Sequence, residues 1–167
     1  MKKLFIYTLA LGLLHAGNSF GQTIGANSKV EKGGDERSLE IINKFLHIIF
    51  IENNKGAGLS DLLDRDFVFD NPFSTARGAN DFITKVQMFI STKKTYKIER
   101  QFVNGDAVCS VYSFDVVTTS ASTENFEVTA YAELRNGKIV KEREYFSDPL
   151  RFAKAMGFLD NYLKAYQ

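Results

Sequence analysis

Hydrophobic residues in the first half of the chain recur at helical spacing. Over residues 38–51 and 79–90 they return every three or four positions, and a shorter apolar group covers residues 59–63. Between the groups at residues 59–63 and 79–90, residues 67–69 are β-prone and lead into Asp70-Asn71-Pro72. This half is therefore predicted to form a helix, a short helix, a short strand and a third helix.

The second half changes to a strand pattern. Val, Tyr, Phe and Thr are frequent in four segments, residues 96–103, 107–118, 126–134 and 139–146. Asn104-Gly105 and Asn136-Gly137 separate two pairs of these segments, and such dipeptides tolerate the positive φ angles of tight hairpins. We expect a largely antiparallel meander, followed by a helical stretch from Pro149 that covers a sheet edge or packs on a second subunit. Segregated helices and strands predict an α+β domain.

The N-terminus has the pattern of a signal peptide. Lys2 and Lys3 precede an apolar run over residues 4–14, and small residues occur up to Gly21. The run is shorter than the roughly 20 residues that a helix needs to cross a bilayer. We expect cleavage before Gln22 and an exported protein, periplasmic or secreted, that is free of the membrane after cleavage.

The domain boundaries follow from the same change in composition. Residues 22–36 are rich in Gly, Asn, Lys and Glu, so they are expected to form a flexible leader. Residues 37–167 are expected to form one domain with a C-terminal helical extension.

Charge and cysteine content exclude several classes of partner. The chain has 21 basic and 20 acidic residues, and its basic residues form no stripe, so nucleic acid is not expected as a partner. Cys109 is the only cysteine, and His47 is the only histidine after the predicted signal peptide. We therefore expect no intramolecular disulfide, no metal site and no cofactor.

Two motifs give the chain a family resemblance. Phe69-Asp70-Asn71-Pro72 is followed by Gly78, and residues 137–146 (GKIVKEREYF) are followed by Asp148-Pro149. In this order of elements, the chain resembles the SnoaL-like branch of the NTF2-like superfamily over about residues 37–158. The resemblance implies a cone, in which a curved sheet encloses the N-terminal helices around a deep, mostly apolar cavity. Relatives include ketosteroid isomerases, polyketide cyclases, limonene epoxide hydrolases and non-enzymatic proteins.

The resemblance to the isomerases makes Asp70 a catalytic candidate, as a proton shuttle at the cavity mouth. Counted back from Pro72, however, the matching residue is Asn71, which cannot accept a proton, and Asp70 falls on the opposite strand face. The alternative is an ordinary turn at Asx-Pro. Phe45 stands where the isomerases carry the tyrosine of the oxyanion hole.

The resemblance to the epoxide hydrolases points to another set. Asp115 and Glu144 could match two of their acids, but Ser113 stands at the position of their arginine.

Strand alternation suggests a polar pair inside the cavity. Arg100 lies in an otherwise apolar row of its strand, and Glu142 and Glu144 share another such row, so one hypothesis is that Arg100 and Glu144 meet in the cavity and bind a polar group of a ligand. The alternative is exposure at the rim of the cone. We expect Asn71, Tyr112, Phe114 and Tyr131 to complete the ligand-binding wall, although core packing would explain the aromatic residues equally well.

Three functions remain open from the sequence. The first is an exported protein that binds a small apolar molecule in the cone without established catalysis. The second is an isomerase or cyclase that uses Asp70, with Arg100 and Glu144. The third is a homodimeric interaction module whose pocket is filled by its own aromatic side chains.

Overall fold

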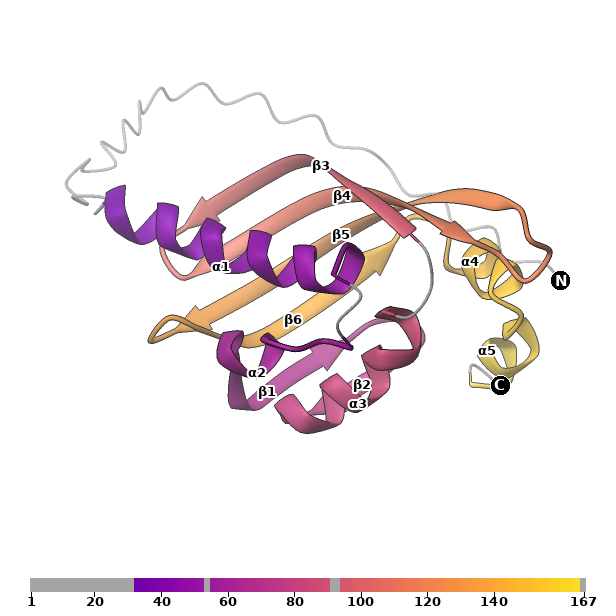
Figure 1. The fold of residues 1–167 in the computed structure, drawn as a ribbon, viewed down its shortest axis with the longest axis horizontal. Helices are drawn as coiled ribbons and strands as arrows, with labels where there is room; N and C mark the ends of the chain where they lie inside the picture. The colour runs from indigo at the N-terminus through magenta and orange to yellow at the C-terminus, as the bar shows by residue number, and fades with distance from the viewer. Residues whose placement is uncertain (1–31, 53–54, 91–93, 166–167) are drawn as a thin grey trace, which may run out of the picture.

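The computed structural model describes residues 32–52, 55–90 and 94–165 (Figure 1). The predicted signal peptide and most of the predicted leader lie outside these residues. Among the described helices, none has the length and apolar character needed to span a bilayer.

A single curved sheet forms the scaffold of the domain (Figure 1). Its six strands lie in the spatial order β2-β1-β6-β5-β4-β3. The strands are β1 (Leu63–Asp70), β2 (Thr75–Arg77), β3 (Lys94–Asn104), β4 (Ala107–Val117), β5 (Thr123–Arg135) and β6 (Lys138–Phe146).

Strands β3 to β6 form the predicted antiparallel meander. The turn between β5 and β6 places Asn136 at φ 54° and Gly137 at φ 75°, and Gly105 has φ 58° in the turn between β3 and β4. These are the left-handed conformations that the two Asn-Gly dipeptides predicted. Strand β1 differs, because it pairs in parallel with β6. The first strand in the sequence therefore lies beside the last one.

The described residues of the first half of the chain form three helices, and all three were predicted. Helix α1 (Lys32–Phe50) runs across the concave face of the sheet, α2 (Leu59–Leu62) follows it, and α3 (Ala79–Ile90) packs near β1 and β2 (Figure 1). Helix α1 begins earlier than the predicted residue 38, so residues 32–36 are helical and do not belong to a flexible leader.

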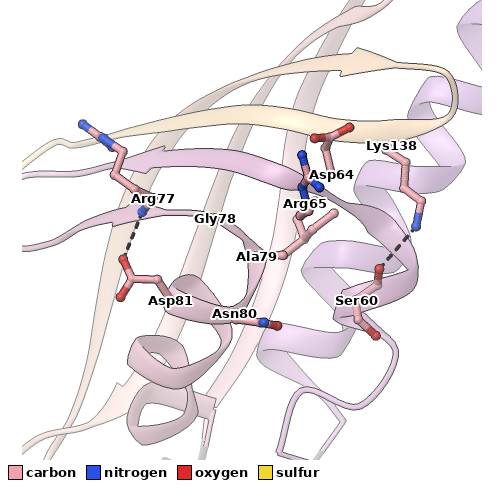
Figure 2. A pocket seen from close by; sticks show the side chains of 10 residues that line it. Ser60, Asp64, Arg65, Arg77, Gly78, Ala79, Asn80, Asp81 and Lys138 are labelled. Atoms are coloured by element: carbon pink, nitrogen blue, oxygen red, sulfur yellow. Dashed lines mark hydrogen bonds between the residues drawn. The ribbon is translucent and has the colours of Figure 1, made fainter.

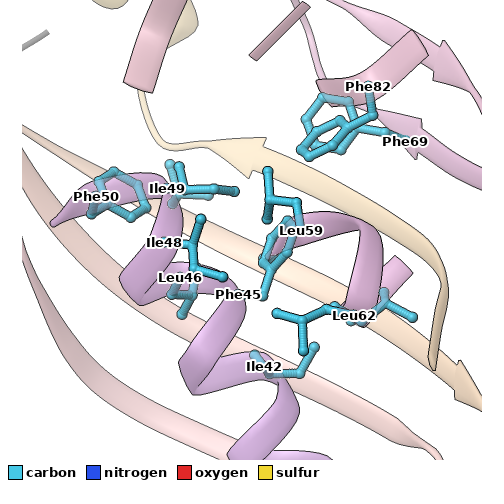
Figure 3. Packing of buried hydrophobic residues seen from close by; sticks show 14 of the residues in the cluster. Ile42, Phe45, Leu46, Ile48, Ile49, Phe50, Leu59, Leu62, Phe69 and Phe82 are labelled. Atoms are coloured by element: carbon cyan, nitrogen blue, oxygen red, sulfur yellow. The ribbon is translucent and has the colours of Figure 1, made fainter. Parts of the chain in front are cut away.

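The core lies between α1 and the concave face of the sheet. Phe45 is 1% exposed and packs on the ring of Phe82 of α3, with 5.9 Å between the ring centroids. Phe67 of β1 packs against the same ring at 5.2 Å. Figure 3 shows this contact region, in which Ile42, Leu46, Ile49, Leu59 and Leu62 supply the aliphatic side chains.

A β-bulge in β3 changes which residues face the core. The pairing with β4 shifts between Ile98 and Arg100, so that the alternation of inward and outward side chains reverses there. Ile98 packs against the core, whereas Arg100 is exposed and Phe102 is 60% exposed. The strict alternation that predicted an inward Arg100 is therefore wrong beyond the bulge.

The C-terminal segment folds as two short helices, α4 (Pro149–Ala155) and α5 (Leu159–Lys164). Asp148 caps α4 by accepting a hydrogen bond from the backbone N–H of Arg151 at 2.9 Å. The Arg151 guanidinium lies 4.4 Å from the centroid of the Phe126 ring, which ties α4 to β5. These contacts hold α4 over one end of the sheet within the same chain.

The packing of Phe67 leads to a stability prediction. Replacing Phe67, which is 0% exposed, with Ala should lower the free energy of unfolding by about 3–5 kcal/mol, because it leaves a cavity beside Phe82. Replacing the exposed Phe102 with Ala should change that free energy by about 0.5 kcal/mol or less. Urea unfolding of both variants measures the difference, and equal losses would contradict this assignment of the core.

Candidate functional site

A cavity of about 470 Å³ opens between the helices and the concave face of the sheet. Its size falls within the usual range of about 300–1,000 Å³ for small-molecule sites. Most of its wall is aromatic or aliphatic. The lining residues are Ile49, Phe50, Phe69, Asn71, Phe73, Ser74, Phe82, Lys85, Val86, Phe89, Tyr112, Phe114, Glu144, Phe146, Phe152, Met156 and Phe158.

The C-terminal helices complete the apolar wall. Phe152 of α4 lies 4.8 Å from Phe146 and 5.0 Å from Phe73, measured between ring centroids. Phe158, just before α5, lies 5.3 Å from Phe73. Edge-to-face and tilted contacts at these distances are favourable between aromatic rings. The segment after Pro149 therefore closes one end of the cavity.

Glu144 is the polar centre of this apolar wall. Its Oε1 accepts a hydrogen bond of 2.8 Å from the Tyr112 hydroxyl, and its Oε2 accepts one of 2.9 Å from Asn71 Nδ2. Ala130 lies on β5, the strand between β4, which carries Tyr112, and β6, which carries Glu144. It pairs with Ser110 on β4 and with Glu144 on β6. Its small side chain leaves space for the Tyr112 hydroxyl and Glu144 to meet across β5.

The turn after β1 fixes the orientation of Asn71. Its Oδ1 accepts hydrogen bonds from the backbone N–H groups of Phe73 and Ser74 at 2.9 and 2.8 Å. Because the amide oxygen faces these two donors, the amide nitrogen must face Glu144. The expected Asx turn is therefore present, and it also supplies a hydrogen-bond donor to the cavity.

Glu142 is a second carboxyl group beneath the cavity wall. It is 2% exposed and lies two residues before Glu144 on the same face of β6. Ala132, a small residue of β5, pairs with it. Among the described residues, none forms a hydrogen bond with its Oε2. A buried carboxyl group with an unpartnered oxygen favours the neutral, protonated form.

Burial changes the titration of all three groups in the same direction. It raises the pKa of Glu142 well above its usual value, and the charge of Glu144 raises it further. Burial also raises the pKa of Glu144, but the hydrogen bonds from Asn71 and Tyr112 act in the opposite direction. Burial raises the pKa of Tyr112 well above 10, so Tyr112 remains a neutral donor. As pH falls, Glu142 is therefore the first of the two carboxyl groups to take up a proton.

Four of the predicted ligand-binding residues lie in the wall of this cavity. Asn71, Tyr112, Phe114 and Glu144 come together there from two strands, β4 and β6, and the turn after β1. Tyr112 is 1% exposed and Phe114 is 2% exposed, so both also belong to the core.

The structure places the catalytic candidate Asp70 outside the cavity. Phe69 points inward, so the next residue points to the opposite face of the sheet, where Asp70 forms ion pairs with Arg77 at 3.2 Å and Arg143 at 3.5 Å. A carboxylate held between two guanidinium groups, away from the cavity, is not placed to exchange a proton with a bound molecule.

Three other predicted positions also face outward. Arg100 is turned out by the bulge in β3, so the predicted meeting of Arg100 with Glu144 is wrong. Tyr131 is 37% exposed, because the inward residues of β5 are its neighbours Ala130 and Ala132. Asp115 binds Thr95 and Asn125 at 3.0 and 2.8 Å on the outer face, so it does not pair with Glu144.

Several wall residues were not predicted from the sequence. Phe50, Phe152 and Phe158 line the cavity, and Met156 lies among them. The helical stretch from Pro149 was expected to cover a sheet edge or pack on a second subunit, and its part in the cavity wall was not predicted. Ala130 and Ala132 pair with Glu144 and Glu142. Two small residues opposite two glutamates are the sequence signal that could have indicated space for polar groups inside the cone.

A second hollow of about 560 Å³ lies on the surface near β1, β2 and the start of α3 (Figure 2). Its charged groups are already engaged. The Asp81 carboxylate accepts a 2.9 Å hydrogen bond from the backbone N–H of Arg77, and Lys138 Nζ binds the backbone oxygen of Ser60 at 3.2 Å. We therefore take the aromatic cavity, with its convergent polar groups, as the candidate site.

The burial of Glu142 leads to a pH prediction. Its pKa is raised in the folded protein, so its contribution to stability is complete below the unfolded pKa of about 4.3 and is lost as pH rises toward the folded pKa. Glu142→Gln should therefore gain stability over the wild type by up to about 1.4 kcal/mol per pH unit across that window.

Urea unfolding between pH 4 and pH 8 measures this gain. Glu127→Gln, a change at an exposed acid of β5, is the matched control and should give a curve parallel to the wild type. A stability difference between Glu142→Gln and the wild type that does not vary with pH would contradict the neutral state of Glu142.

Solved structures with the same fold support the assignment of this architecture. An LEH-like epoxide hydrolase from M. tuberculosis is 22% identical, with 79% of this chain and 96% of that chain covered and a TM-score of 0.59. A protein from Catenulispora acidiphila with a ketosteroid isomerase-like fold, solved in complex with trimethylamine, is 14% identical over 71% and 92% of the two chains, with a TM-score of 0.60.

An NTF2-like protein of unknown function from Burkholderia pseudomallei is 11% identical, covers 72% of this chain and 97% of its own, and has a TM-score of 0.62. At these identities the likeness shows the fold alone. No curated protein is similar enough to count as a match. The family model of the SnoaL-like domain matches residues 43–142, which is more than half of the chain. The chain therefore belongs to the SnoaL-like domain family, and its fold is the NTF2-like fold.

Proposed function

We propose that the protein binds a small, mainly apolar molecule in the cone cavity, with a polar group of that molecule at Glu144. The observation that carries this proposal is the aromatic cavity itself, in which Glu144 is held by Asn71 and Tyr112. Sites for small molecules commonly combine an apolar wall with a few polar groups that fix orientation. The wall supplies affinity, and Glu144 orients the molecule.

The volume of the cavity favours ligand binding over an interaction module with a filled pocket. About 470 Å³ remains between the aromatic side chains, although ten of the lining residues are Phe or Tyr. The C-terminal helices pack on the cavity within one chain, so closure of this end needs no second subunit.

Two structural neighbours are consistent with a small-molecule site in this fold. One is an epoxide hydrolase, and another was solved with trimethylamine. Both likenesses concern the fold alone, so the argument for a small organic ligand rests on the residues of this cavity.

Export and dimerisation remain separate proposals. An N-terminal sequence that starts at Gln22 in protein recovered outside the cytoplasm would support export, and an uncleaved N-terminus would contradict it.

The exposed rings of Phe102, Tyr131 and Tyr145 project from β3, β5 and β6, and they are the apolar groups that a homodimer could cover. Light scattering at micromolar concentration that shows only a monomer would remove the dimer.

Filling the cavity should prevent ligand binding. We expect the neutral fluorescent probe N-phenyl-1-naphthylamine to bind the wild type with one site per chain, and Val86→Trp to weaken binding at least tenfold because the indole occupies the cavity. Phe102→Trp, a change of similar kind on the outer surface, should leave binding unchanged. Fluorescence titration measures both, and equal affinity in all three proteins would contradict a ligand site in the cone.

A second candidate function is proton transfer with Glu144 as the general base. Burial raises the pKa of Glu144, which brings a carboxylate closer to the pH at which general bases work well. Its Oε1 and Oε2 each accept one hydrogen bond, so each keeps a lone pair for a water molecule or a substrate proton.

This candidate predicts different effects for two acid-to-amide changes. If the protein hydrates a model epoxide such as styrene oxide, Glu144→Gln should lower kcat by about 10²-fold or more, because the base is lost. Asp70→Asn should leave kcat within about twofold, since Asp70 lies on the other face of the sheet. Steady-state hydration rates measure both, and a larger loss in Asp70→Asn would refute the assignment.

A further inference from the structure

Acidic groups at the cavity outnumber the basic groups that could pair with them. Glu144 borders the cavity and Glu142 lies beneath it, yet no salt bridge in the described part of the chain includes either residue. Lys85 of α3 also borders the cavity, but its Nζ already binds the Asp81 carboxylate at 2.9 Å and the backbone oxygen of Thr75 at 2.7 Å. Among the described residues that line the cavity, the acidic centre therefore has no cation paired with it.

The hydrogen bonds at Glu144 stabilise its ionised form without neutralising its charge. Asn71 and Tyr112 are neutral donors, and each gives one hydrogen bond to a different carboxylate oxygen. A carboxylate oxygen can accept more than one hydrogen bond, so both oxygens retain acceptor capacity toward the cavity. A charge held in apolar surroundings is stabilised most by an opposite charge that enters the same space.

The aromatic wall acts in the same direction. Phe50, Phe73, Phe89 and Phe114 are among the rings around the cavity, and the faces of aromatic rings carry partial negative charge. Ammonium groups bind favourably against such rings, especially where water is excluded. A wall of aromatic rings with one carboxylate therefore matches an organic cation in both shape and charge.

We propose that the molecule bound in this cavity is an organic cation, a protonated amine with an apolar and preferably aromatic body, whose ammonium group binds at Glu144. This inference rests on the proposed function, since it names the chemical class of the ligand for the same site. The ammonium group donates to the free lone pairs of Glu144, and the body of the molecule fills the aromatic part of the cavity.

Neutral and anionic molecules fit the same site less well. An alcohol can donate one hydrogen bond to Glu144, but it leaves the carboxylate charge without compensation. A carboxylate ligand meets the negative charge of Glu144, and the neighbouring donors of Asn71 and Tyr112 already point at Glu144. The expected order of affinity is amine, then alcohol, then carboxylate.

The charge of Glu144 also makes this preference depend on pH. The titratable groups that face Glu144 are Glu142 on the same strand and Tyr112 on β4, while Lys85 borders the cavity from α3. The lining residues on α1 and the C-terminal helices are apolar. Acidification protonates Glu144 while an alkylamine stays charged, so the preference for the amine should diminish as pH falls.

Three probes of matched shape test the inference by isothermal titration calorimetry at pH 7.5. They are 4-phenylbutylamine, 4-phenylbutan-1-ol and 4-phenylbutanoate. The wild type should bind the amine at least tenfold more tightly than the alcohol and should bind the carboxylate most weakly. Glu144→Gln should reduce the difference between amine and alcohol to threefold or less. Asp70→Asn removes the same charge from the opposite face of the sheet and should keep the full preference.

The wild type alone provides an independent test if Glu144→Gln does not fold. Its ratio of amine affinity to alcohol affinity should fall at least threefold between pH 7.5 and pH 4.5. Equal affinity for amine and alcohol at pH 7.5, or a ratio that does not change with pH, would overturn the cationic ligand while leaving a ligand site in place. If neither these probes nor N-phenyl-1-naphthylamine bind, both the inference and the proposed function fall.

Discussion

The placement of a carboxyl group inside an apolar cone is the constraint on which the rest of the site depends. A charge in such surroundings is unfavourable unless donors reach it, and Asn71 and Tyr112, which lie 73 and 32 residues before Glu144 in the sequence, both reach it. The parallel pairing of β1 with β6 brings Asn71 beside Glu144, and the small Ala130 lets Tyr112 reach across β5. The sheet topology, rather than a local motif, therefore builds the polar end of the cavity.

The elements were predictable because their signals are local. Helical spacing in residues 79–90 and the Asn136-Gly137 turn each depend on a few neighbouring side chains, and both agree with the structure. The bulge that turns Arg100 outward was not predictable in this way, because strict alternation assumes that no strand contains an extra, unpaired residue. The parallel contact of β1 with β6 joins segments far apart in the chain, so no local pattern indicates it.

The candidate site was predictable to the extent that strand faces were. Tyr112, Phe114 and Glu144 alternate with outward residues on regular stretches of strand, so their inward position followed from spacing. Asp70 was a candidate through the family resemblance, and alternation already placed it on the other face, as the structure shows. Phe152 was missed as part of the wall because a helix docks according to the shape of the surface it covers, which the sequence does not contain.

The titration of Glu142 and Glu144, the two carboxyl groups of β6, tests most directly whether the apolar cone shields them from water. NMR of protein with ¹³C-labelled glutamate side chains follows each carboxyl carbon with pH, and Glu142→Gln and Glu144→Gln assign the two signals. We expect two linked titration steps, with at least one midpoint well above the ordinary glutamate value of about 4.3. Two independent titrations near that ordinary value would mean that the carboxyl groups are in contact with water, and would contradict their burial in the apolar cone.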